Sequence, residues 1–247
     1  MKKHVKILII IVGIILMAII ALVLWNAISS HREGCRTDRS RTRLATPPFT
    51  FKEEDKALNS EDFFYSNTAH NFTIGLGMNK EEAFSLMRRH NPRIDVSRTK
   101  EREVICGVTT RIYIHRLETF IFENELLTFI GSESDNDINL NWSIYGGIDS
   151  NTSREEIIEI LGEPTIYQGT RSMTYIFFKT EDGNYQKLRN REEARWFARK
   201  SRVTQLKYID FAGGDSHRFI GVELSSLTAN DHVDGTLQRL LQGSTDY

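Results

Sequence analysis

The pattern of apolar and polar positions divides the chain near residue 26. Residues 7–25 form an unbroken apolar run, ILIIIVGIILMAIIALVLW, with no charged residue and no proline. A helix of these 19 residues is about 28 Å long, which matches the hydrocarbon thickness of a bilayer. The run therefore predicts one transmembrane helix from Ile7 to Trp25, followed by a domain of mixed composition.

The charges beside this run do not decide its orientation. Lys and Arg flank it on both sides, so the positive-inside rule is nearly balanced. Because long downstream domains cross a membrane largely regardless of charge, we expect residues 1–30 to be a cytoplasmic tail and a retained signal anchor in the cell membrane, with the remaining domain outside the cytoplasm. Two alternatives stay open: a cytoplasmic domain, and a signal peptide cleaved before Ser30, where Ala27 and Ser29 supply small residues.

Residues 31–70 are predicted to be a linker followed by a lead-in helix. The first part is rich in Arg, Ser and Thr and ends in Pro47-Pro48, a composition typical of an extended linker. In the second part, Asn59 or Ser60 is suited to cap a short helix.

One pattern then occurs twice, and it predicts two repeats, at 71–140 and 141–228. The sequence GMNKEE at 77–82 is echoed by GID at 147–149 and, after four further residues, by REE at 154–156. Each copy is therefore expected to begin with a tight turn at a glycine and to continue into a helix.

The start of each helix is encoded locally. Asn79 and Ser153 are good N-caps, and Ser153 with Glu156 makes the capping-box pattern. Apolar residues then follow at i, i+3 and i+4, the spacing of a helix that packs along one side. We expect Leu86 and Ile160, one on each helix, to be buried.

Alternating apolar and polar residues after each helix predict antiparallel strands. In the first copy the expected strands are 111–115, 119–122 and 126–130, with a turn at 123–125. In the second copy they are 173–178, 205–211 and 219–224, with a turn at 181–183. The predicted fold class is α+β: an N-terminal transmembrane helix, then two repeats of a helix plus a three- to four-stranded antiparallel sheet, then a C-terminal helix and tail at 229–247.

The two copies together carry both ends of a known pattern. The segment 77–82 reads GMNKEE, and LGEP stands at 161–164. These segments resemble the Gly-Met-Thr/Ser-x-Glu-Glu and Leu-Gly-x-Pro ends found in the SmpA/OmlA family of outer-membrane assembly lipoproteins, and they are similar to the tandem units of β-lactamase inhibitory proteins. Neither copy carries both ends, and the lipid-anchored Cys of the lipoproteins has no counterpart. The resemblance implies a protein-binding module outside the cytoplasm.

Composition and motifs give no catalytic or metal site. The formal net charge of −1 argues against a nucleic-acid binder, and the seven histidines are scattered without the spacing of a helical metal site. Residues 135–146 begin like a calcium loop, but Leu140 and Gly146 stand where Gly and Glu are required. Cys35 and Cys106 either form one disulfide or stay unpaired. We expect no catalytic residue, no metal and no cofactor.

The most unusual stretch is an insertion at 184–203, which has no counterpart in the first copy. Seven Lys or Arg stand there against two Glu, with an aromatic pair in the middle. Because Trp and Arg often anchor protein interfaces and basic residues attract anionic lipid, we expect four residues to contact an acidic partner protein or the membrane: Arg195, Trp196, Phe197 and Arg199. The alternative is a solvated helix whose aromatic pair packs on the sheet.

Together these observations favour a single-pass membrane protein whose outer domain binds an unidentified protein without catalysis. Two other functions stay open. One is an enzyme whose site is assembled between the repeats, and the other is an immunity-type inhibitor, which the resemblance alone suggests. No pattern in the sequence indicates an oligomeric state.

Overall fold

The computed structural model divides the chain into two units, Met1–Thr42 and Arg43–Tyr247. The described residues are 13, 17–23, 25, 47–51, 55–90, 100–104, 107–114, 118–133, 142–168, 172–200, 206–213 and 221–226. In the first unit, residues 17–23 are helical, and six large apolar side chains between 17 and 25 are exposed. Within these described ranges, no helix is both long enough and apolar enough to cross a membrane. The span expected from Ile7 to Trp25 falls largely outside them.

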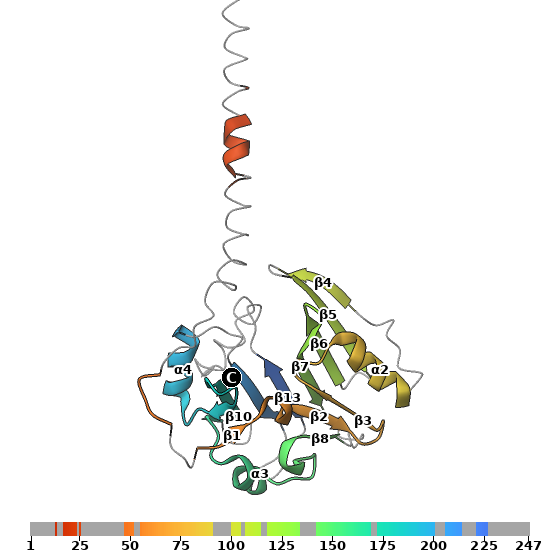
Figure 1. Ribbon diagram of the computed structural model, residues 1–247, viewed down its shortest axis with the longest axis vertical. Helices are drawn as coiled ribbons and strands as arrows, with labels where there is room; N and C mark the ends of the chain where they lie inside the picture. The colour runs from red at the N-terminus through yellow and green to blue at the C-terminus, as the bar shows by residue number, and fades with distance from the viewer. Residues whose placement is uncertain are drawn as a thin grey trace, which may run out of the picture. The chain divides into compact units, whose positions relative to one another are not determined.

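Most strands of the second unit belong to one antiparallel sheet (Figure 1). Its strand order is β1-β11-β10-β12-β13-β7-β6-β5-β4, with β9 paired to β10. The strands are β1 (Ala57–Leu58), β4 (Lys100–Val104), β5 (Gly107–Ile114), β6 (Glu118–Glu123), β7 (Leu126–Glu133), β9 (Ile166–Tyr167), β10 (Ser172–Lys179), β11 (Tyr185–Lys187), β12 (Leu206–Ala212) and β13 (Gly221–Ser226).

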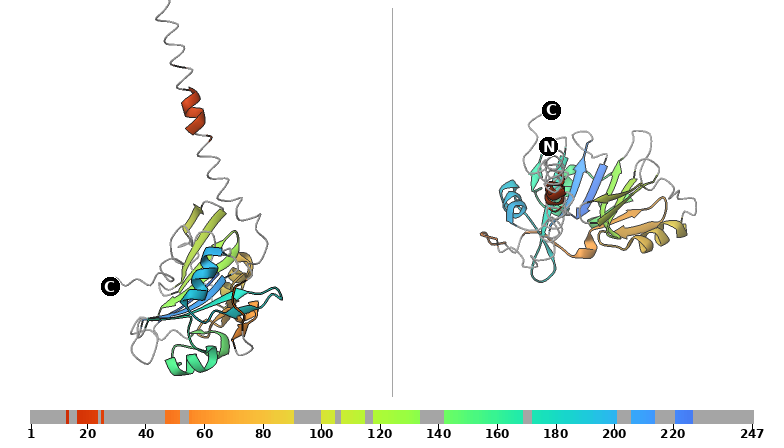
Figure 2. Two further views of the ribbon diagram at one scale, coloured as in Figure 1. Left: turned by 90° about the vertical axis from the view of Figure 1, so that its left-hand side faces the viewer. Right: turned by 90° about the horizontal axis from the view of Figure 1, so that it is seen from above.

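A second, three-stranded sheet has the order β3-β2-β8. Figure 2 shows its β2–β3 pair and the helix α2 on the same side of the large sheet. The remaining elements are β2 (Phe64–Asn67), β3 (Phe72–Gly75), β8 (Trp142–Ser143), the helices α2 (Lys80–His90), α3 (Arg154–Leu161) and α4 (Arg191–Lys200), and the single 3₁₀ turns η1 (Ser60–Asp62) and η3 (Tyr145–Gly147). The expected α+β class with antiparallel sheets is confirmed.

Both helices form where their caps predict them. Ser153 Oγ accepts a hydrogen bond from the Glu156 amide at 3.3 Å, and the Glu156 carboxylate accepts one from the Ser153 amide at 2.8 Å. Asn79 Oδ1 likewise accepts a hydrogen bond at 2.9 Å from the amide two residues on. The preceding turns contain Gly77 at φ 90° and Gly147 at φ 77°, a conformation that only glycine adopts at little cost.

The buried side of each helix differs from the expected one. Leu86 and Ile160 are only half-buried and pack against the edge of the core, so the expectation of full burial is wrong. The fully buried side chains are pairs four residues apart, Ala83 with Met87 and Ile157 with Leu161. The centre of each apolar stripe therefore runs along the i, i+4 pair, and the i+3 residue lies at its margin.

The expected strands are confirmed wherever they fall within the described ranges, but their grouping is different. The β6–β7 hairpin turns at Asn124 and Glu125, whose φ values of 50° and 69° suit a two-residue hairpin turn. Two separate sheets, one in each repeat, were the expectation. Instead, β7 pairs with β13, so strands from both halves form one sheet. The equivalence of the two halves stays a prediction.

The core lies on both faces of β10, because successive side chains of a strand point to opposite faces. Met173, Tyr175 and Phe177 join a large cluster that also holds the buried residues of β2, β3, α2 and α3. Ile176 and Phe178 join a smaller cluster with residues of α4. Both faces of this strand are therefore closed by packing.

Two segments fold differently from their predictions. The lead-in helix is only the turn η1, capped by Asn59, and the chain then enters strand β2. The insertion at 184–203 contains β11, which extends the large sheet, and α4, which covers it. Other predictions lie outside the described residues: the C-terminal helix in 229–247, both cysteines, and the calcium-like stretch 135–140.

Replacing Phe197 with Ala should lower the free energy of unfolding by about 3–5 kcal/mol, because it opens a cavity in the smaller cluster. The Phe197 ring is fully buried, with its centroid 3.8 Å from that of Phe178. The control is Glu192→Gln on the exposed side of the same helix, which should change the value by about 0.5 kcal/mol or less. Urea denaturation of the full chain followed by tryptophan fluorescence measures both, and equal effects of the two variants would contradict the assignment.

Candidate functional site

The two aromatic residues that were expected to contact a partner differ in how deeply they are buried. Phe197 has no exposed surface, so the expectation is wrong for this residue, because the helix turns its ring onto β10. Trp196 is half-buried, and its ring packs edge-on against Phe49 and Phe197 at centroid distances of 6.1 and 5.0 Å. Both rings help to close the smaller cluster, as in the alternative considered for this segment.

The charges of the insertion are partly used within the chain. Arg189 contacts Glu193 through an Nε–Oε1 hydrogen bond of 2.8 Å, and Arg195 Nη1 lies 3.9 Å from Glu192 Oε1. Arg199 lies on α4, and its side chain is outside the described part. Two of the basic side chains in the insertion are therefore engaged by glutamates of the same segment.

Lys187, the first lysine of the insertion, is buried and holds the end of α3. Its Nζ donates to the carbonyl oxygens of Leu161 and Glu163 at 3.0 and 2.7 Å. The last carbonyls of a helix lack partners within the helix, and a cation there also suits the helix dipole. Burial lowers the pKa of Lys187. The insertion is thus part of the folded core.

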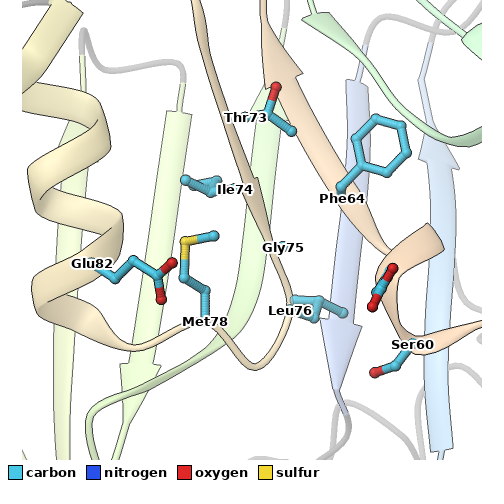
Figure 3. Close-up of a pocket in the computed structure, with 9 residues that line it drawn as sticks. Ser60, Phe64, Thr73, Ile74, Gly75, Leu76, Met78 and Glu82 are labelled. Carbon is cyan, nitrogen blue, oxygen red and sulfur yellow. The ribbon is translucent and has the colours of Figure 1, made fainter.

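The candidate site is a pocket of about 340 Å³ that lies over the outer face of β2 and β3. Figure 3 shows Glu82 of α2 on one side of it and Ser60 of η1 on the other, with Leu76 and Met78 between them. The residues that line the pocket are Ser60, Glu61, Phe64, Thr73, Ile74, Gly75, Leu76, Met78 and Glu82. Its surface is therefore mainly apolar, with two carboxylates and two hydroxyls.

A missing side chain contributes to this hollow. Gly75 on β3 pairs directly with Phe64 on β2, so the position beside the Phe64 ring carries no side chain. A Cβ atom built at Gly75 would lie 3.5 Å from the Phe63 carbonyl oxygen, an ordinary contact. The backbone therefore has room for a side chain at residue 75, and a larger residue there would fill part of the pocket.

The pocket also lies beside the edge of a sheet, because β3 is the outer strand of the order β3-β2-β8. The Leu76 amide donates to the Phe63 carbonyl at 2.9 Å, which fixes the alternation of hydrogen-bonded pairs. By this alternation, the backbone groups of Thr73 and Gly75 point away from β2. Among the described residues, neither of their amides has another backbone partner. Two N–H donors therefore lie along the outer edge of β3, beside the pocket.

The charges of the pocket are negative. Glu61 and Glu82 are both exposed, and within the described part neither forms an ion pair. An exposed carboxylate pair beside an apolar surface attracts a cation that carries an apolar stem, such as a Lys or Arg side chain.

A second buried lysine, Lys207 of β12, lies behind the pocket. Its Nζ donates to Ser60 Oγ at 3.0 Å and lies 4.5 and 4.4 Å from the ring centroids of Phe63 and Tyr185. It is 5% exposed, and no carboxylate bonds it among the described residues. Burial lowers the pKa of Lys207 to about 8, and the positive charge of Lys179 acts in the same direction.

A buried polar cluster joins the small sheet to the large one. Glu118 Oε1 accepts hydrogen bonds from Tyr65 Oη and, at 2.8 Å, from Asn67 Nδ2, and Tyr65 Oη also lies 3.3 Å from Ser132 Oγ. Burial and the Glu118 charge raise the pKa of Tyr65, so its hydroxyl stays neutral and donates. We assign this cluster a structural role, because each of its groups has a partner.

Sequence reasoning missed the pocket and Lys207. Ser60 was considered only as a helix cap, and no pattern links it to a lysine 147 positions away. No group of side chains that could hold a metal ion occurs in the ranges that the structure describes. No family model matches the chain, and neither curated proteins nor solved structures give a significant match.

The burial of Lys207 predicts how stability depends on pH. Its pKa is about 8 in the folded chain and near its ordinary 10.5 when unfolded, so between these values the unfolded state binds more protons. The free energy of unfolding should therefore rise by about 2 kcal/mol between pH 7 and 9.5. Above about pH 10 it should fall, because burial raises the pKa of Tyr65, Tyr175 and Tyr185.

Chemical denaturation of the full chain at a series of pH values measures this rise. Lys207→Met should remove most of it, while Lys80→Met, which changes a lysine outside the core, should retain it. A rise of the same size in wild type and Lys207→Met would contradict the assignment.

Proposed function

We propose that the protein is a single-pass membrane protein whose extracytoplasmic domain binds an extended segment of another protein. The observation that carries this proposal is the pocket beside the edge of β3. An extended segment can add to a sheet edge through backbone hydrogen bonds, while its side chains enter neighbouring pockets and give specificity.

The geometry of β3 suits this mode of binding. The outward amides of Thr73 and Gly75 are the donors that an added strand needs. The apolar surface of Phe64, Leu76 and Met78 can receive an apolar side chain. The sheet edge thus supports binding of an extended main chain, and the pocket supports a choice among side chains.

The charge of the pocket supports a basic segment. Glu61 and Glu82 are positioned for a Lys or Arg of the partner, whose charged head would meet a carboxylate while its stem lies on the apolar surface. This proposal differs from the acidic partner inferred from the insertion, because Lys187, Arg189 and Arg195 contact groups of the chain itself.

The membrane anchor is the second part of the proposal. Its support is the apolar run at 7–25 and the exposure of the apolar side chains described between Met17 and Trp25. Such a surface is stable when it is covered by lipid. The anchor would confine the binding domain to the membrane surface. An immunity-type inhibitor would be one form of this function, with the bound protein as its target.

Filling the pocket tests the proposal. Gly75→Val should abolish capture of the partner without unfolding the domain, because valine suits a strand and its Cβ meets no close atom. A photoreactive benzoylphenylalanine at Phe64, introduced into the full chain in membranes, captures the partner. The same group at Tyr167, an exposed site on β9, is the control for non-specific capture.

A crosslink from residue 64 that maps to an extended, Lys- or Arg-containing segment is the expected product. Equal products from residues 64 and 167, or full capture in the Gly75→Val background, would contradict the proposal.

Removing the carboxylates tests the charge of the partner. Glu61→Gln together with Glu82→Gln should weaken binding of the captured segment about tenfold at low salt, since each exposed ion pair contributes up to about 1 kcal/mol. The matched control is Glu155→Gln with Glu159→Gln, two exposed glutamates on α3 that change the net charge equally. Titration of a labelled peptide of the captured sequence measures both, and equal losses in the two variants would indicate only a net-charge effect.

A further inference from the structure

The contact between Ser60 and Lys207 suits a chemical reaction as well as binding. This reaction does not depend on the proposed protein partner. Ser60 lines the pocket, while Lys207 lies behind it in the core. The Ser60 hydroxyl and the Lys207 amine are 3.0 Å apart, which is the distance over which a base can remove the hydroxyl proton.

The surroundings of Lys207 differ from those of an ordinary structural lysine. A buried lysine is usually paired with a carboxylate. Here, among the described residues, its Nζ meets the faces of Phe63 and Tyr185 and the oxygens of Ser60. The positive charge of Lys179 on β10 also acts on Lys207 and disfavours its protonated form.

We propose that Ser60 is a nucleophile activated by Lys207, and that it reacts with the carbonyl of an ester or amide bound in the pocket. This assigns an acyl-transfer activity to a site assembled from η1, β3 and α2 in front and β12 behind. A serine hydroxyl needs such a neighbouring base, because it is a weak nucleophile at its own pKa.

The chemistry requires no further reactant than water. Lys207 in its neutral form accepts the Ser60 proton while Ser60 Oγ forms a bond to the carbonyl carbon. Collapse of the tetrahedral intermediate breaks the bond to the leaving alcohol or amine, which takes the proton from Lys207. Water then attacks the acyl-serine carbonyl while Lys207 takes its proton. Cleavage of the acyl–Oγ bond releases the carboxylic acid, and Lys207 returns the proton to Ser60 Oγ.

Thr73 and Gly75 line the same pocket as Ser60. Their amides are directed to the outer edge of β3 and, being two residues apart on one strand, lie about 7 Å from each other. One of them at most can therefore donate to the oxyanion of a tetrahedral intermediate. Because the pKa of Lys207 is about 8, roughly a tenth of the protein carries the neutral base at pH 7, and the fraction rises to a half at pH 8.

Labelling with a fluorophosphonate tests this activity. Ser60 Oγ would displace fluoride from phosphorus, the proton would pass to Lys207, and the product would be a stable phosphonyl serine. We expect the full chain in detergent to be labelled, with peptide mapping placing the label on Ser60. The labelling rate should rise with pH with a midpoint near 8.

Variants show whether Ser60 reacts because Lys207 activates it or only because its hydroxyl is exposed. Ser60→Ala should remove the label, and Ser66→Ala, which changes a hydroxyl on β2 that does not line the pocket, should leave it unchanged. Lys207→Met should lower the labelling rate at least 100-fold, and Lys207→Arg should not restore it, because arginine does not act as a base at these pH values. Thermal melting of each variant shows whether it is folded.

Two results would overturn the inference. One is a folded wild-type chain in which Ser60 is not labelled between pH 7 and 9. The other is labelling whose rate and pH midpoint are the same in wild type and in folded Lys207→Met. Because the probe is small, neither result depends on a protein partner being found, so the binding proposal and this one can fail separately.

Discussion

Coverage of β10 on both faces is the constraint on which the rest of the domain depends. Every side chain from Met173 to Phe178 is buried, so each face of this strand requires its own layer. The β2–β3 sheet with α2 and α3 supplies one layer, and α4 supplies the other. The Thr174 hydroxyl in this run is bonded to Asp210 on the next strand.

Local signals of the sequence were enough to place the helices α2 and α3 and the clearest hairpin. Ser153 with Glu156 encodes a cap within four residues, and Asn124 with Glu125 encodes a turn within two. Such features depend on the nearest residues, so they can be inferred before the tertiary fold is known. The α+β class follows from the same signals, because helices and alternating strands occur in turn.

The assembly of these elements could not be inferred in the same way. β11 and α4 appeared to be a surface insertion because their sequence is basic, but Lys187 is buried with its charge directed at two carbonyl groups. The pocket depends on Gly75 lying opposite Phe64, a register that no local rule specifies. Ser60 and Lys207 meet only because η1 packs over β12. Contacts of this kind are set by long-range pairing and have no signature in short segments.

The pairing of β7 with β13 matters for how the two halves of the domain hold together. These strands run antiparallel, with Gly221 opposite Glu133 and Ser225 opposite Phe129. Neighbouring antiparallel strands are related by a local two-fold axis, which is also the symmetry of an isologous dimer. Either half alone would expose this strand as an unpaired edge, the kind of surface through which sheets of separate chains pair. Because the two halves belong to one chain, their pairing does not depend on protein concentration. Two separate polypeptides would pair to an extent set by their concentration.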